Sequence, residues 1–325
     1  MFASLRSTLP RQFARAYSSG ASSGAKSGNG ILWASLATGA VIAGGYYYTR
    51  SKEQKDIDIN AVAAGPVTKA LDPTKFVSFK LQEVTPINHD TAHFRFALEP
   101  NQELGMDVTS CFVVKAKIGD DAKPTIRPYT PVSPQHARGH FDLVVKKYPT
   151  GKMSSHIHSL SPGDTLDIKG PIGKYPYKAN ALKEIGMVAG GSGITPMIQV
   201  IEQVLNDPKD NTKLTLVFAN KSEEDIILRS TLDGYAAKHP DQFKVHYVVD
   251  KASSADWKGD TGYVTNELVQ KYLPAASEGN ILVSVCGPPP MMKSVSGPKA
   301  PDFTQGEVEG IFKELGYASE QVFKF

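Results

Sequence analysis

The segment VAGGSGITPM, residues 188–197, decides which fold this chain adopts. An apolar stretch ends there in GGSG (190–193), and PMIQVIEQVL follows with the periodicity of a buried helix. Pro196 stands where the third glycine of a G-x-G-x-x-G dinucleotide motif would fall. Because proline is favoured at the first position of a helix, it marks a helix start. The segment therefore predicts a strand, a glycine loop that a ligand can approach, and a helix N-terminus.

The residues after this loop alternate between apolar strands and helical stretches, and Thr195 adds a hydroxyl at the helix start. Taken alone, G-G-x-G-x-T-P also fits a simple tight turn. The strands expected are 185–189, 214–220, 243–250 and 281–287, with helices near 196–205, 223–238 and 265–272. This alternation predicts a parallel sheet wound with helices, an α/β nucleotide-binding domain over residues 179–325.

Residues 71–178 show a different pattern, in which short segments rich in Val, Phe, Ile and Thr are separated by turn signals. One short helix is expected at Met153–Leu160. The six expected strands are 75–84, 91–98, 110–118, 125–133, 140–148 and 165–170. Short strands at this spacing predict an antiparallel β-barrel.

The first 70 residues divide into three parts. Residues 1–30 are rich in Arg, Ser and Ala and lack acidic residues, which is typical of a targeting segment, although a disordered tail looks partly similar. Residues 31–48 are uncharged with aromatic ends, and at 1.5 Å per residue they just span a core of about 30 Å. We expect one transmembrane helix there, a single-pass anchor in a lipid bilayer, with a secretory signal as the alternative. Residues 49–70 form a polar linker.

Charge and cysteine content exclude several classes of protein. The formal net charge is +3, but six basic residues precede the first acidic one, and the remainder has 30 basic and 33 acidic residues. No nucleic-acid-binding face is therefore expected. Two cysteines are too few for a disulfide framework or an iron–sulfur cluster, and a reducing compartment is the simpler interpretation. The eight histidines show no metal-ligand spacing, so we expect no metal site.

Two stretches of the barrel half have the chemistry of anion sites. In RPYTPVS (127–133), an arginine fork suits a diphosphate and the nearby tyrosine can stack on a planar ring. The alternative is an ordinary edge strand with an exposed arginine. GKMSSHI (151–157) places glycine, lysine and serine at a helix start, which favours an anion, although simple capping by Ser154 also fits. With the loop at 190–193, these stretches indicate two nucleotides that face one another.

Five motifs together carry a resemblance to a known family. RPYTPVS, GKMS, GGSGITPM, CGPPPM and the terminal Phe325 occur in the order and spacing of the flavoprotein pyridine nucleotide–cytochrome reductases, over about residues 72–325. The leader and VTSCFVVKAKI resemble the fungal mitochondrial type of the NADH–cytochrome b5 reductases in this family. The resemblance implies an FAD-binding barrel of the ferredoxin-reductase type, followed by an NADH-binding domain.

The resemblance also implies an activity and a location. NADH would give hydride to FAD, and FAD would give single electrons to cytochrome b5 or a similar haem protein. The chain would be a monomer in the mitochondrial outer membrane, with a processed form in the intermembrane space as an alternative. Three other readings remain: a reductase for another cytochrome, nitrate or a quinone, a non-catalytic nucleotide sensor, and a structural anchor. Intact Arg127, Lys152, Thr195 and Cys286 argue against a loss of chemistry.

The family's functional residues carry over position by position. The residues expected to bind FAD are Arg127, Pro128, Tyr129, Thr130, Val144, Val145, Lys146, Tyr148, Gly151, Lys152, Met153 and Ser154. Thr195 is expected beside the flavin, and Phe325 completes the cofactor set. The residues expected to form the NADH side are Gly190, Gly191, Gly193, Pro196, Asp250, Cys286, Gly287, Pro288, Pro289 and Met291. Asp250 ends a strand, where a carboxylate can accept hydrogen bonds from ribose hydroxyls.

Three of these residues are candidate catalytic residues. Thr195 would lie near the hydride path, Cys286 would orient the nicotinamide without acting as a nucleophile, and Lys146 would lie beside the flavin. The sequence departs from the family in two places. Position 192 is Ser where Thr is common, and the segment YPTGK is shorter than in animal relatives.

Overall fold

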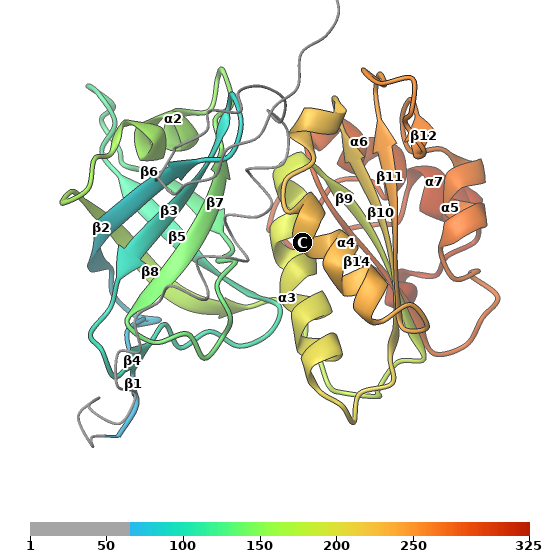
Figure 1. Cartoon of the computed structure of the whole chain (residues 1–325), viewed down its shortest axis with the longest axis horizontal. Coiled ribbons are helices and arrows are strands. Elements are labelled where there is room, and N and C mark those ends of the chain that lie inside the picture. The colour runs from blue at the N-terminus through green and yellow to red at the C-terminus, as the bar shows by residue number, and fades with distance from the viewer. Residues whose placement is uncertain (1–65) are drawn as a thin grey trace, which may run out of the picture. The chain divides into compact units, whose positions relative to one another are not determined.

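The computed structural model of the chain describes residues 66–325, which belong to one compact unit (Figure 1). The expected targeting segment and membrane anchor, and most of the expected linker, lie outside the described residues. From residue 66 onward, no helix combines the length and the apolar character that crossing a bilayer requires.

The first half of the described chain is an antiparallel sheet of six strands in the order β6-β5-β8-β2-β3-β7 (Figure 1). The strands are β2 (Val77–Pro86), β3 (Thr91–Ala97), β5 (Ser110–Ala116), β6 (Thr125–Tyr129), β7 (His140–Lys146) and β8 (Thr165–Gly173). Helix α2 (Lys152–Ser159) contacts the two edge strands, β6 and β7. The six antiparallel strands confirm the sequence prediction, and the helix covers the gap between the edges.

Aromatic side chains fill the interior of this sheet. Phe141 of β7 stacks on Phe96 at 5.1 Å between ring centroids, and it meets Phe79 and Phe112 edge to face at 5.2 and 5.9 Å. These four rings come from four different strands, and all are buried. The alternation of Phe and polar residues along each strand therefore determines which face of the sheet is the core.

The second half is a parallel sheet of six strands in the order β12-β11-β10-β9-β13-β14. The strands are β9 (Glu184–Gly190), β10 (Lys213–Asn220), β11 (Phe243–Val249), β12 (Asp260–Thr261), β13 (Ile281–Cys286) and β14 (Val322–Lys324). Helices α3 (Ile194–Asn206) and α4 (Arg229–Lys238) cover one face. Helices α5 (Asn266–Tyr272), α6 (Pro289–Val295) and α7 (Gly310–Glu314) cover the other. The predicted α/β domain is confirmed.

Several element boundaries differ from the sequence prediction. The expected helix 223–238 is interrupted: a single 3-10 turn (Glu223–Asp225) is separated from α4 by Ile226 and Ile227, which are buried, and by Leu228 with φ of 59°. The chain leaves the helical path because both isoleucines pack into the core. Four short strand pieces were not predicted: β12 has two residues, β14 has three, and β1 (Thr68–Lys69) and β4 (Gln102–Glu103) form a two-residue pair.

The sequence predicts Pro196 as the first residue of a helix, but in the structure it is the third residue of α3. A 3-10 turn, Gly191–Gly193, lies before the helix. Residues in the first turn of a helix have N–H groups without an intrahelical acceptor, so a proline is tolerated there as well. The physical reason for the proline is therefore unchanged, although the helix begins two residues earlier.

A buried charge cluster joins β3 to β7. Asp142 accepts two hydrogen bonds from Arg95, at 2.8 Å from Nε and 2.9 Å from Nη2, and its Oδ2 lies 3.3 Å from Nε2 of His93. Burial alone would raise the pKa of Asp142, but the hydrogen bonds from Arg95 and His93 outweigh it and hold that pKa far below its usual value. The ionised carboxylate is therefore part of the native pairing of these strands.

We expect Asp142→Asn to lower the free energy of unfolding by about 2–3 kcal/mol at pH 7, because Arg95 and His93 lose a charged acceptor. A carboxylate whose pKa is lowered in the native state stabilises the fold fully at a pH above its ordinary pKa of 3.8. This stabilisation is lost progressively as the pH falls below 3.8 toward the lower native pKa. The difference between variant and wild type should thus persist at pH 5 and shrink below about pH 4. Urea unfolding followed by circular dichroism measures it. Glu278→Gln, which removes an exposed ion pair with Lys183, is the control and should leave the free energy of unfolding nearly unchanged.

Candidate functional site

The glycine loop after β9 packs directly on the loop after β13. A Cβ atom placed on Gly193 would lie 2.1 Å from the carbonyl oxygen of Cys286, and one on Gly190 would lie 2.6 Å from Sδ of Met291. A side chain at position 193 would require the backbone to move, and one at position 190 would displace the side chains of Met291 and Pro288. Two of the predicted NADH motifs, GGSGITPM and CGPPPM, are therefore brought together by backbone contact, with Gly191 at φ of 52° completing the turn.

The helix that follows this loop begins without a side-chain cap. Gly193 is the N-cap of α3, no side chain of the described residues bonds to its free N–H groups, and the first turn holds no acidic residue. The hydroxyl of Thr195 donates to the carbonyl oxygen of Ser192 at 3.3 Å. Pro196 is buried against the sheet. The positive end of a 13-residue helix is thus open to an anion.

The carboxyl ends of four neighbouring strands lie in a row along one edge of the parallel sheet. In the order of the strands they carry Cys286 (β13), Gly190 (β9), Asn220 (β10) and, one residue beyond β11, Asp250. The exposed Asp250 is held in this row because its N–H donates to the carbonyl oxygen of Asn220 at 3.0 Å. Three strand spacings separate the ends of the row, about 14 Å. Such an edge is where ligands bind in open parallel sheets.

In the barrel half, strand β6 presents its predicted ligand residues from an edge. Arg127 is exposed and donates from Nη1 to the carbonyl oxygen of Ile126 at 2.8 Å, and within residues 66–325 no carboxylate forms an ion pair with it. Tyr129 is two residues further along and so faces the same side. Burial raises the pKa of Tyr129 to about 12, and the charges of Arg127 and Tyr148 act on it as well. Arg127, Tyr129 and Tyr148 therefore lie near one another, with Pro128 and Thr130 in the same segment.

The start of α2 provides a second uncapped helix end. Gly151 is the N-cap and forms no side-chain cap bond. Ser154 does not cap the helix, since its hydroxyl accepts from the N–H of Tyr148 at 3.2 Å and donates to the carbonyl of Gly151 at 3.1 Å. Lys152 forms an exposed ion pair with Asp121 at 2.7 Å. The side chain of Met153 is buried in the barrel core, so only its backbone faces this helix end.

Strand β7 carries three of the predicted flavin residues, and the structure separates them by face. Val144 packs into the core that contains α3, while Val145 packs into the barrel core. Lys146, the last residue of β7, donates from Nζ to Asp90 at 2.7 Å and to Asp225 at 2.9 Å. Burial alone would lower the pKa of Lys146, but these hydrogen bonds raise it. The ammonium therefore remains charged and joins the barrel to the α/β half.

Asp90 and Asp225, the partners of Lys146, were not predicted from the sequence. Asp90 belongs to the turn between β2 and β3, which the sequence marks only as a turn, and Asp225 lies in the stretch expected to be helical. Asp225 also accepts from the hydroxyl of Ser222 at 2.8 Å, and these hydrogen bonds outweigh burial and lower its pKa. Nothing in the local sequence signals the pairing, because it requires the tertiary fold.

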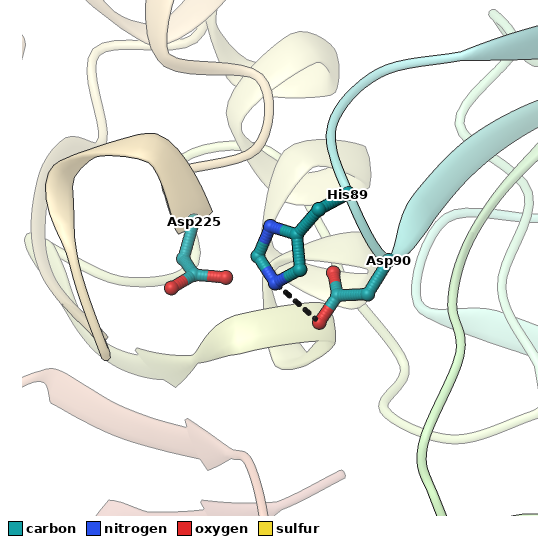
Figure 2. Close-up of side chains that lie close together, drawn as sticks. All are labelled: His89, Asp90 and Asp225. Carbon is teal, nitrogen blue, oxygen red and sulfur yellow. Dashed lines mark ion pairs between the residues drawn. The ribbon is translucent and has the colours of Figure 1, made fainter.

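Figure 2 shows His89 between Asp90 and Asp225. Nε2 of His89 lies 3.4 Å from Oδ2 of Asp90, and one ligand atom from each of the three residues lies within 4.8 Å of the others. Such a group could hold a metal ion. However, the ammonium of Lys146 already donates to both carboxylates, so a cation balances their charge. The cluster is therefore best described as an ion-pair network.

A second contact joins the barrel half to the glycine loop. The hydroxyl of Tyr148 lies 2.8 Å from Oγ of Ser192, within hydrogen-bonding distance. A Cβ on Gly191 would lie 3.8 Å from the same hydroxyl. Position 192, where the sequence departs from the family pattern, therefore supplies a hydroxyl that bonds across the two halves.

The end of β13 carries the remaining predicted residues. Burial raises the pKa of the Cys286 thiol to about 12, so it is protonated at neutral pH, which argues against a thiolate nucleophile. Gly287 and Pro288 continue the loop, and Pro289 and Met291 lie in α6. The N–H of Phe325 donates to the carbonyl of Val285 at 3.0 Å. The chain terminus thus lies beside the residue that precedes Cys286.

Comparison with known proteins agrees with this arrangement. Residues 78–177 match the model of the oxidoreductase FAD-binding domain, and residues 187–297 match that of the oxidoreductase NAD-binding domain. An NADH-cytochrome b5 reductase-like protein of Arabidopsis thaliana is 47% identical over 307 residues, 92% of each chain. NADH-cytochrome b5 reductase 2 of Mycosarcoma maydis is 43% identical over 346 residues, 99% of this chain and 95% of the relative.

A solved structure of lower sequence identity shares the fold. The cytochrome b5 reductase domain of Ulva prolifera nitrate reductase is 33% identical, with a TM-score of 0.69, and covers 79% of this chain and all of that one. Three observations point to the same family: the order of the two domains, the motifs at the sheet edges and the identity of these relatives. The chain belongs to the NADH-cytochrome b5 reductase family.

Proposed function

We propose that this chain passes electrons from NADH to FAD and then, one at a time, to cytochrome b5 or a similar haem protein. The observation that carries the proposal is that two helices, α2 and α3, begin without a side-chain cap and that a hydrogen-bonding contact joins the loops before them. The open N-terminus of α3 lies behind a glycine loop that bonds to the barrel through Tyr148 and Ser192. The names of the two relatives support cytochrome b5 as the acceptor, since each name includes the words cytochrome b5 reductase.

The residues along the parallel-sheet edge fit NADH. The close approach of Gly193 to Cys286 leaves no room for a side chain at position 193, and no side chain caps the start of α3, so this helix end can face a pyrophosphate. Asp250 is exposed at the far end of the row, where its carboxylate can accept from ribose hydroxyls. The row runs from Cys286 to Asp250, so we assign the nicotinamide to the Cys286 end and the adenosine to the Asp250 end.

The residues of the barrel edge fit FAD. Arg127 has a guanidinium without an acidic partner in the described chain, and it lies near two tyrosine rings. The start of α2 offers uncapped N–H groups for a phosphate. Lys152 can add a cation there, since its partner Asp121 is a surface residue. These features are those of a site for a planar ring joined to a diphosphate.

The bound flavin supplies the conversion between a two-electron donor and a one-electron acceptor. The chain's residues hold and orient the reactants. The packed glycine and proline loops fix the nicotinamide end of the nucleotide, and the hydroxyl of Thr195 lies at the same helix start. Arg127 and the free N–H groups at the helix starts favour negative charge on the cofactors. Hydride transfer needs no side chain to remove a proton, which agrees with a protonated thiol at Cys286.

The location is a further part of the proposal. The acid-free leader at 1–30 supports import into mitochondria, and the apolar segment 31–48 supports a single-pass anchor in the outer membrane. The polar linker would then hold the two nucleotide-binding domains away from the bilayer. A form processed after the anchor would be released into the intermembrane space.

We expect Arg127→Ala to fold but to lose most of its bound FAD, because a charge-assisted bidentate contact with the diphosphate disappears. The flavin absorbance per protein after purification measures the loss, and added FAD should restore it with at least a tenfold weaker Kd. Arg138→Ala is the matched control, since Arg138 is also an exposed arginine of the barrel but lies 3.6 Å from Glu103. Full flavin occupancy in Arg127→Ala would refute the assignment.

We expect Asp250→Thr to raise kcat/KM for NADPH and to lower it for NADH roughly tenfold or more, with unchanged flavin content. The carboxylate accepts from the ribose of NADH and repels the 2′-phosphate of NADPH, and the variant removes both effects. Steady-state kinetics with each nucleotide measures the ratio. The exposed Asp256 of the next loop provides the control, Asp256→Thr. An unchanged ratio in Asp250→Thr would place the determinant elsewhere.

We expect deletion of residues 1–54 to give an enzyme that stays in solution, binds FAD and reduces cytochrome b5 with an unchanged kcat. The reason is that the described residues 66–325 belong to one compact unit, which contains both predicted nucleotide-binding domains. The full chain should instead sediment with membranes and with mitochondrial markers after cell fractionation. Loss of flavin from the truncated protein, or a soluble full-length chain, would contradict this expectation.

A further inference from the structure

Asn220 is a buried amide without a partner. The residue is 7% exposed, and in the described chain neither Oδ1 nor Nδ2 forms a hydrogen bond. The conclusion does not depend on which way the amide is turned, because both of its atoms are unpaired. Leaving a buried amide unpaired destabilises a fold, so the position calls for an explanation.

Other buried polar side chains of the same sheet are satisfied within the protein. Ser284 of β13 donates to the carbonyl of Gly186 at 3.5 Å, and Thr215 of β10 lies 3.2 Å from Oε1 of Glu184. Thr212, just before β10, donates to Asp210 at 2.7 Å. Asn220 differs from these residues in its place, at the carboxyl end of its strand, where the sheet meets its ligand edge.

The strand alternation fixes the face on which Asn220 lies. Leu214, Leu216 and Phe218 precede it at intervals of two residues and belong to the core that α3 and α4 cover. Asn220 is therefore the polar last member of an otherwise apolar row, on the side from which α3 starts. The preceding residue, Ala219, pairs with Gly190, and the 3-10 turn Gly191–Gly193 contacts β10.

Asn220 also occupies the middle of the row of strand ends. Gly190 and Cys286 lie to one side of it, on β9 and β13, and Asp250 lies to the other, beyond β11. With the nicotinamide assigned to one end and the adenosine to the other, the middle of the row faces the pyrophosphate and the ribose next to it. The strand that ends in the unpaired amide also contacts the turn Gly191–Gly193, which leads into the uncapped start of α3.

We propose that the carboxamide of Asn220 is a binding group for NADH, kept unpaired in the protein so that it can bond to the centre of the nucleotide. Its Nδ2 donates to a phosphate oxygen, and its Oδ1 accepts from a ribose hydroxyl. A carboxamide suits this position because it supplies one donor and one acceptor without charge. The inference rests on the proposed function, since it assumes that NADH lies along this edge.

The test separates the cost of the unpaired amide from its benefit to binding. Asn220→Leu has nearly the same shape but no polar atoms, so the flavin-loaded protein without nucleotide should melt about 2–4 °C higher than wild type. The same variant should bind NAD⁺ roughly 10- to 100-fold more weakly by titration calorimetry and show a matching rise in KM for NADH. Asn220→Ala, which cannot clash, should lose similar affinity.

Gln135→Leu is the matched control, because Gln135 carries a buried unpaired Nε2 in the barrel half, away from the row. It should leave the Kd for NAD⁺ unchanged. Unchanged NAD⁺ affinity in both Asn220 variants would overturn the inference, as would a lower melting temperature in Asn220→Leu, which would mean that the amide has a structural partner. Failure of the wild type to bind NAD⁺ would instead count against the proposed function.

Discussion

The backbone contact between Gly193 and Cys286 is the constraint on which the site depends. A single Cβ at position 193 would lie 2.1 Å from the carbonyl of Cys286, so the loops after β9 and β13 can converge only if this residue is glycine. Their convergence sets the start of α3 beside the CGPPPM loop. The glycines of this chain thus serve packing between two loops as well as access for a ligand.

The ion-pair network around Lys146 imposes a second constraint. One ammonium from the end of β7 bonds to carboxylates from two turns, one in each half of the described chain. Removing such groups from water costs much of the energy that their attraction supplies, so the net stabilisation is modest. The directional bonds nevertheless fix how the barrel edge is placed against the end of the 3-10 turn Glu223–Asp225. Electrostatics therefore contributes more to geometry here than to stability.

The sequence predicts most of the fold because the decisive patterns are local. The apolar strands β9, β10 and β13 and the glycine loop can be read without tertiary information, as can the six strands of the barrel. The features that the sequence does not predict depend on contacts between residues far apart in the chain. Lys146 is 56 residues from Asp90 and 79 from Asp225, and the break at Leu228 arises because Ile226 and Ile227 are buried in the core. The unpaired state of Asn220 also needs the whole environment. β12 is too short for any periodicity.

The protonated state of Cys286 has a consequence for the lifetime of the enzyme. Peroxide and similar oxidants react with thiolates and only slowly with thiols. A protein that handles electrons from NADH near oxygen is exposed to such oxidants, and its cysteine lies in the loop that carries the nicotinamide end of the row. Because burial raises the pKa of this thiol to about 12, almost none of it is ionised at neutral pH. The burial that raises this pKa therefore keeps the thiol in its less reactive, protonated form.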